Sequence, residues 1–234
     1  MIPLRDNVIT RRFPVVNISL IILNILVFIY QLLLPGEAAH HLVSQYGVIP
    51  VELTGGLTSF FSGDLEYAIL LPGSILSLFT ATFLHGGWLH LLGNMIYLWV
   101  FGDSIEDRLG SLRYLGIYLS MGVMGSIFHI MFNPLSSTPL IGASGAIAGV
   151  LGCYLLLYPR ASILTLVPIG FFITFIHIPA ILFLGIWFLL QLFNALGTQA
   201  VGAGAQSVAW WAHVGGFLVG LIMVIFLRAQ QKIR

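Results

Sequence analysis

Residues 139–149, PLIGASGAIAG, set a single serine, Ser144, among small residues at the start of an apolar run that continues to Tyr158. Glycines on both sides would let other groups approach its hydroxyl closely. A helix beginning here would direct its free N–H groups and its positive dipole end toward negative charge formed near Ser144. A nucleophilic serine needs such surroundings, but a small-residue surface for helix packing has the same pattern. The rest of the chain has to distinguish these two interpretations.

The composition indicates a membrane protein. Of 234 residues, 59% are hydrophobic and 7% are charged, and the mean hydropathy is +1.02. The apolar runs are long and continuous, which favours membrane-spanning helices over a closed barrel. Cys153 is the only cysteine, which excludes an intramolecular disulfide and a cysteine-based zinc site. The net charge of +1 gives no reason to expect a nucleic-acid partner.

The apolar runs predict an all-α polytopic protein with six transmembrane helices, at 14–34, 79–101, 114–132, 144–158, 178–196 and 210–227. This gives three parts, which are a cytoplasmic N-terminal segment 1–13, a six-helix domain 14–228 and a cytoplasmic tail 229–234. We expect the first span to remain uncleaved, because its apolar stretch is longer than a signal-peptide core. The long connection 35–72 is predicted to lie in the membrane interface. The run 163–176, interrupted by Pro168-Ile169-Gly170, is interpreted as an interfacial excursion.

The basic residues test this count of spans. Six spans bring all of them to one face: Arg5, Arg11, Arg12, Arg108, Arg113, Arg160, Arg228, Lys232 and Arg234. By the positive-inside bias, this face is cytoplasmic and both termini lie on it. A further full span at 163–176 would move the last three basic residues outside. We therefore expect a multi-pass protein of a prokaryotic plasma (inner) membrane, with its active site toward the outer face.

Polar side chains within the spans gather at one depth. His90 and Asn94 are four residues apart, so they share a helix face near the outer end of the second span. Ser144 begins the fourth span from the same side, and His213 lies near the outer start of the sixth. Polar residues inside a membrane indicate function by default.

These four residues are suited to acyl-transfer chemistry. A serine hydroxyl attacks a peptide carbonyl only if a base takes its proton, and His213 is the best candidate. Small-residue pairs at 145/149 and 216/220 would let the two helices approach closely enough for this contact. His90 and Asn94 are donors suited to the developing oxyanion. No acid lies within any predicted span, so we predict a Ser–His dyad, although the acids at 37–66 lie on the correct side of the membrane.

Three motifs together resemble the signatures of the rhomboid intramembrane serine proteases. They are His85-(x4)-His90-(x3)-Asn94, Gly142-Ala143-Ser144-Gly145 and Ala212-His213-(x2)-Gly216-(x3)-Gly220. The segment 106–113, EDRLGSLR, resembles the loop that follows the second span in that family. The match covers nearly the whole chain, in order.

The resemblance implies a six-helix rhomboid-like bundle with a long membrane-associated loop between its first two helices. It further implies a Ser144–His213 dyad that cleaves transmembrane protein substrates within the lipid bilayer. His90 and Asn94 would then form the oxyanion site, with His85 and Gly142 in supporting positions. The fifth span would gate a polar cavity that opens to the outer face under the 35–72 loop.

The chain departs from the family pattern at two places. Some members carry Trp-Arg before the first motif histidine, where this chain has Leu76-Ser77. Some carry an aromatic residue one helical turn after the serine, stacked on the catalytic histidine, where this chain has Ala148. Loop attachment and imidazole orientation must then come from other residues.

Other functions fit the sequence less well. A non-proteolytic rhomboid-like protein that binds transmembrane helices stays the main alternative, although loss of Ser144 or His213 would favour it and both are present. A transporter lacks support, because there is no inverted repeat and no acid-lined pathway. Zinc at His85 and His90 is disfavoured, because no H-E-x-x-H motif occurs and the spans supply no carboxylate ligand. We expect no metal and no cofactor.

Overall fold

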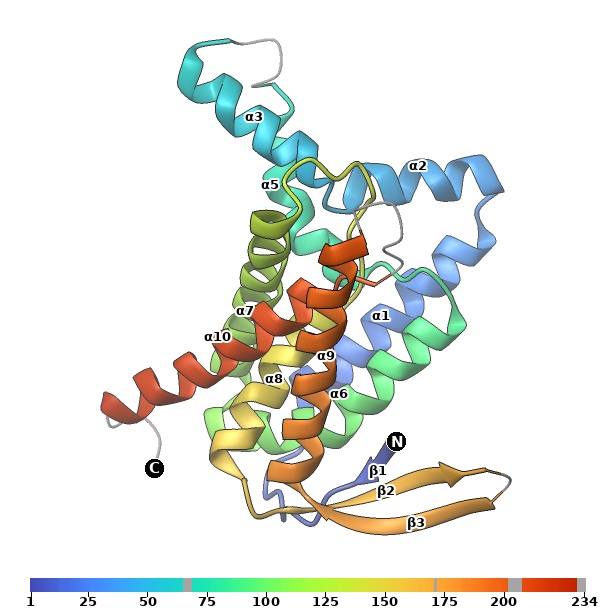
Figure 1. Ribbon diagram of the computed structural model, residues 1–234, viewed down its shortest axis with the longest axis vertical. Coiled ribbons are helices and arrows are strands. Elements are labelled where there is room, and N and C mark those ends of the chain that lie inside the picture. Colours follow the sequence, from blue (N-terminus) through green and yellow to red (C-terminus); the bar gives the residue numbers. More distant parts are fainter. Residues whose placement is uncertain (65–68, 171, 202–207, 231–234) are drawn as a thin grey trace.

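A computed structural model describes residues 1–64, 69–170, 172–201 and 208–230 (Figure 1). Its helices are α1 Val15–Leu33, α2 Gly36–Tyr46, α3 Pro50–Ser62, α5 Leu71–Thr80, η1 Ala81–Phe83, α6 Trp88–Leu109, α7 Ser111–Phe132, α8 Ser144–Leu157, α9 Ala180–Val201 and α10 Trp210–Ala229. Its strands are β1 Ile2–Arg5, β2 Ser162–Ile169 and β3 Phe172–Pro179. Most of the expected tail 229–234, and most of the Gly/Ala/Gln-rich loop before α10, lie outside the described residues.

The protein is a polytopic bundle of membrane helices, as predicted. Among the described residues, α1, α7, α9 and α10 are long and apolar enough to cross a membrane, and α5–η1 with α6 forms a pair bent by 79°. The short helix α8 has 14 residues, which at the usual rise extends about 21 Å, against about 30 Å for a bilayer core. The count of six spans therefore stays a prediction.

The second apolar run folds differently from the expected span at 79–101. The chain is extended at Gly87, so α6 starts only at Trp88 and then continues to Leu109. The turn to α7 is Gly110, with φ of 82°, in place of the loop expected at 102–113. Glu106 lies in this last part of α6, where its carboxylate accepts hydrogen bonds from the backbone N–H groups of Val16 and Asn17 in the first turn of α1 and from the Ser111 hydroxyl.

The run 163–176 does not form a span, in agreement with the sequence interpretation, but it is a β-hairpin and not a helix. Strands β2 and β3 pair antiparallel from Ser162↔Pro179 to Ile169↔Phe172, and β1 adds to the other edge of β2. The hairpin extends away from the helices (Figure 1), and Phe172 is 80% exposed. The location of this segment in the membrane interface stays a prediction.

Helix α8 lies at the centre of the bundle. Every residue from Gly145 to Tyr154 is buried, and α8 packs against α10, α7 and α6. A β-carbon on Gly220 of α10 would lie 2.0 Å from the carbonyl oxygen of Gly149, and one on Gly149 would lie 2.3 Å from the sulfur of Met121. The contact between Gly220 and Gly149 confirms the predicted close packing of α10 on α8 through small residues.

Candidate active site

Ser144 occupies the first position of α8. The chain reaches it through Gly142, whose φ of 118° favours glycine. The Gly142 N–H donates to the carbonyl oxygen of Ala81 at 2.8 Å, which fixes the turn. The hydroxyl therefore stands at a helix N-terminus, where free N–H groups and the helix dipole favour negative charge.

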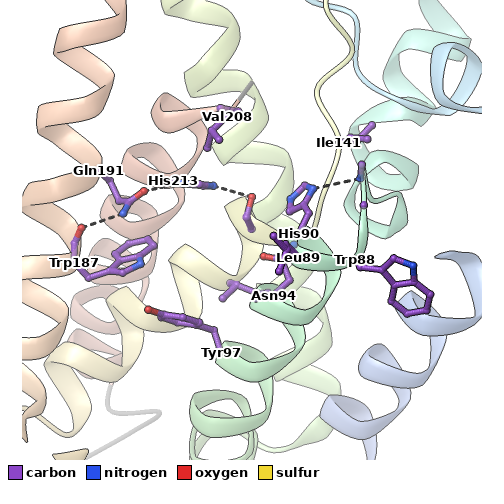
Figure 2. Close-up of a pocket in the computed structure, with 16 residues that line it drawn as sticks. Trp88, Leu89, His90, Asn94, Tyr97, Ile141, Trp187, Gln191, Val208 and His213 are labelled. Atoms are coloured by element: carbon purple, nitrogen blue, oxygen red, sulfur yellow. Dashed lines mark hydrogen bonds between the residues drawn. The ribbon is translucent and has the colours of Figure 1, made fainter. Parts of the chain in front are cut away.

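A chain of two hydrogen bonds joins three helices at this serine (Figure 2). The Ser144 hydroxyl lies 2.8 Å from Nε2 of His213 on α10. On the other side of the ring, Nδ1 lies 2.9 Å from Oε1 of Gln191 on α9. An amide oxygen only accepts, so Nδ1 carries the proton and Nε2 presents its lone pair to the hydroxyl.

His90 and Asn94 of α6 lie beside the turn that precedes Ser144. Nδ1 of His90 accepts a hydrogen bond from the Gly86 N–H at 3.4 Å, so its Nε2 is the N–H donor. A β-carbon on Gly142 would lie 2.6 Å from that Nε2 and 3.7 Å from Nδ2 of Asn94. Two side-chain donors thus converge on the backbone next to the serine.

His85 lies behind Asn94 and is 2% exposed. Its Nε2 lies 3.0 Å from Nδ2 of Asn94. Gln31 of α1 holds the His85 backbone twice, because its Oε1 accepts from the N–H at 3.0 Å and its Nε2 donates to the carbonyl at 3.2 Å. This contact attaches the loop before α6 to α1.

Four of the side chains that the sequence singled out, those of His90, Asn94, Ser144 and His213, line one cavity, whereas His85 and Gly142 do not. The cavity has a volume of about 730 Å³, and its lining includes His90, Asn94, Tyr97, Ser144, Gln191 and His213. In Figure 2, the labelled side chains of α6 lie across this cavity from those of α9 and α10. A space of this size accommodates a short extended peptide segment together with water.

Two glutamines of this site were not identified from the sequence, namely Gln31 and Gln191. Each is an amide side chain within an apolar membrane helix, and each is 8% exposed. A polar residue in a membrane helix is itself a functional signal, so both could have been found.

Two tryptophans lie against His213 in place of the aromatic residue that some family members carry at the position of Ala148. Trp187 and Trp210 flank the imidazole, with ring centroids at 6.1 and 5.9 Å and interplanar angles of 35° and 90°. Trp187 of α9 and Trp210 of α10 thus lie on either side of the histidine, although neither belongs to a motif in the sequence. Trp211 stacks on Phe132 in the same region, with centroids 3.7 Å apart.

The part of the chain that the structure describes gathers no group of three or more His, Cys, Asp or Glu side chains able to hold a metal. His85 and His90 lie with ring centroids 5.1 Å apart, but their nearest polar partners are an amide and a backbone N–H. The expectation of no metal and no cofactor stays a prediction.

Known proteins resemble this chain over the same region. The family model described as Rhomboid domain matches residues 72–230. Rhomboid protein 1, mitochondrial, of Saccharomyces cerevisiae is 33% identical over 69% of this chain and 44% of its own length. Rhomboid protease GluP of Bacillus subtilis is 39% identical over 45% of this chain and 21% of its own. Presenilin-associated rhomboid-like protein, mitochondrial, of Mus musculus is 29% identical over 81% and 46%.

The chain thus spans less than half the length of each of these relatives. The domain match covers α5 to α10, and with them Ser144, His213 and the other named residues of the site except Gln31 on α1. A match over more than half of the chain, to a domain of membrane helices, agrees with the fold described above. The chain belongs to the rhomboid family.

Proposed function

We propose that this protein is an intramembrane serine protease that hydrolyses peptide bonds in or near the transmembrane segments of membrane-protein substrates. The observation that carries the proposal is the 2.8 Å contact between the Ser144 hydroxyl and Nε2 of His213. The acceptor oxygen of Gln191 beside Nδ1 favours the tautomer in which Nε2 can accept the proton. A hydrogen-bonded nucleophile and base, with the base oriented by a third group, is the arrangement that activates serine.

The reaction begins with acyl transfer to the serine. Oγ of Ser144 attacks the carbonyl carbon of the substrate peptide bond while Nε2 of His213 takes the hydroxyl proton. The tetrahedral intermediate then breaks its C–N bond, and the imidazolium returns the proton to the departing amine. The products of this half are an acyl-serine and a new amino terminus.

Negative charge on the tetrahedral oxygen needs donors that are already in place. Nε2–H of His90, the amide of Asn94 and the free N–H groups at the start of α8 face this region. His85 acts through Asn94, because its ring lies against the amide that would otherwise rotate. Gly142 contributes because it has no side chain, since a β-carbon at this position would clash with the ring of His90.

Water completes the cycle. It enters the cavity, loses a proton to His213 and attacks the acyl carbonyl. The tetrahedral intermediate then breaks its bond to Oγ of Ser144, and the imidazolium returns the proton to that oxygen as the second product leaves. We place the opening of the cavity on the face opposite the basic residues. The substrate arrives from the lipid, past α9, which we propose as its gate because the resemblance to rhomboid proteases implies it.

The orientation follows from the basic residues, which we place on the cytoplasmic face with both termini. Asp107 supports this grouping, because its carboxylate accepts hydrogen bonds from the N–H groups of Arg11 and Arg12. Asn7 accepts one from the Ser162 N–H, which brings the α8–β2 connection to the same face. The named relatives include mitochondrial and bacterial proteins, so they do not support the expected prokaryotic inner membrane over a mitochondrial one.

Purified protein incubated with a panel of single-span membrane proteins tests the proposal. We expect at least one substrate to be cut in or near its span, with the site mapped by mass spectrometry, and no cut by folded Ser144→Ala. The alternative is a non-proteolytic member of the family that binds transmembrane helices. Co-purification of spans without cleavage, equally by wild type and Ser144→Ala, would favour that alternative.

A further inference from the structure

We propose that Gln191 is the positioning residue of this site, which holds His213 in the tautomer and orientation that a general base requires. The proposal rests on the proposed protease function. It means that α9, which carries Gln191, helps to orient the general base. Gln191 touches no reacting atom in this arrangement. It acts through the imidazole, on the nitrogen that faces away from Ser144.

The amide of Gln191 is itself oriented. Its Nε2 donates to the carbonyl oxygen of Trp187, one turn earlier on α9, at 3.2 Å. The NH₂ group is therefore directed along its own helix, and Oε1 faces Nδ1 of His213 at 2.9 Å. Because an oxygen cannot donate, this contact selects the imidazole with its proton on Nδ1.

The side chains of Ala148, Trp187 and Trp210 offer no acceptor at that position. Ala148, one turn after the serine, is fully buried and carries no polar atom. Trp187 and Trp210 limit the tilt of the ring, but an indole has only an N–H donor. Gln191 thus performs, with a neutral amide, the orienting role that a carboxylate has in a serine–histidine–aspartate triad.

The position of Gln191 on α9 has a mechanistic consequence. This helix exposes much of its surface, including Phe193 at 75% and Leu189 at 62%, and 28% of its apolar stretch is buried against 56% for α10. When α9 moves away from α10, Oε1 leaves Nδ1 and the base loses its orientation. Chemistry therefore requires α9 to be seated against α10.

The experiment compares Gln191→Met with Gln191→Glu. Methionine has a similar shape but is a poor acceptor, whereas glutamate keeps an oxygen at the same place. We expect kcat to fall about tenfold in Gln191→Met, the loss of one neutral hydrogen bond in the transition state, with KM unchanged. We expect Gln191→Glu to restore most of kcat. Leu190→Met, which changes a half-exposed neighbour on α9, is the matched control.

A spectroscopic readout makes the test independent of turnover. Nitrogen-15 chemical shifts of labelled His213 should report the Nδ1–H tautomer in wild type and Gln191→Glu, and a mixture of tautomers in Gln191→Met. Wild-type shifts in Gln191→Met, or an effect confined to KM, would overturn the positioning role. If instead Ser144→Ala kept cleaving substrate, the proposed protease chemistry would fail while the tautomer result stood on its own.

Discussion

A β-carbon on Gly216 would lie 2.0 Å from the carbonyl oxygen of Gly145. The two glycines belong to α10 and α8, and each sits beside one member of the serine–histidine pair. Ser144 precedes Gly145 directly, and His213 precedes Gly216 by less than one helical turn. The closeness of the two backbones at this point is what brings the imidazole within hydrogen-bonding distance of the hydroxyl.

Gly216→Ala should therefore damage stability and activity together. The added methyl group forces α8 and α10 apart, at a cost of about 1–3 kcal/mol for overpacking, and it lengthens the contact between Oγ and Nε2. Thermal unfolding in detergent and turnover of a cleaved substrate measure the two effects. Gly116→Ala on α7 is the matched control, because nothing lies within 4 Å of its added β-carbon. Equal behaviour of the two variants would show that the close approach is unimportant.

Asn94→Ala tests the oxyanion donors. We expect turnover to fall by about two to three orders of magnitude if the amide supplies a full-strength donor, and by less if His90 and backbone N–H groups share the charge. Ser144→Ala should be the most damaging change and His213→Ala nearly equal to it. Wild-type turnover in a folded Asn94→Ala variant would remove this amide from the mechanism.

Much of this site could be predicted from the sequence, because its residues lie in motifs that combine a polar side chain with glycines at helical spacing. Ser144 and His213 are in contact, and His90, Asn94 and Gly142 meet around the adjacent turn. Gln31 and Gln191, in contrast, lie in no such motif. An isolated amide in an apolar run shows that it needs a partner, but it does not show which helix supplies that partner.

The hairpin and the break before α6 were missed for other reasons. The run 163–176 is apolar without a clear period, and such a run does not distinguish a strand from a short helix. The third strand, β1, comes from residues 2–5 and pairs with β2, and no local pattern in the sequence reports such a distant pairing. The pair Gly86-Gly87 marks the break before α6 in the sequence. The span was predicted from the apolar run at 79–101 alone, and this run continues across the two glycines.

Gln199→Met tests whether the packing of α9 against α10 controls the orientation of His213. Gln199 ties this helix to its neighbours, because it donates to the Phe132 carbonyl and accepts from the indole N–H of Trp211, both at 3.3 Å. Loosening α9 should raise the rate at which a transmembrane substrate enters, yet lower the labelling of Ser144 by a small fluorophosphonate. Leu196→Met, on an exposed position of the same helix, should change neither rate. A rise or a fall in both rates together would contradict this control of His213 by α9.

Asp6 should make stability depend on pH. Its carboxylate accepts hydrogen bonds from Ser104 and Tyr154 on the basic face of the bundle, and burial raises its pKa above the usual 3.8. The folded state therefore binds a proton more tightly than the unfolded state, so this contribution to stability is present at low pH and is lost as pH rises through the folded pKa.

Thermal unfolding of wild type and Asp6→Asn in detergent, between about pH 4 and pH 7, measures this term. Wild type should lose unfolding temperature relative to Asp6→Asn as pH rises, because the asparagine has no charge to bury. A constant difference between the two proteins across this range would contradict the assignment.

Covalent labelling of Ser144 by a fluorophosphonate tests the central claim most directly, because the reagent reports a serine activated by a base and an oxyanion site. Mass spectrometry should place the label on Ser144 in wild type and in Cys153→Ala, whose thiol is buried deeper along α8. The label should be absent from Ser144→Ala, nearly absent from His213→Ala and unaffected by EDTA, with each variant shown to be folded. Labelling of another residue, proteolysis by folded Ser144→Ala, or loss of activity with EDTA would contradict the serine–histidine mechanism.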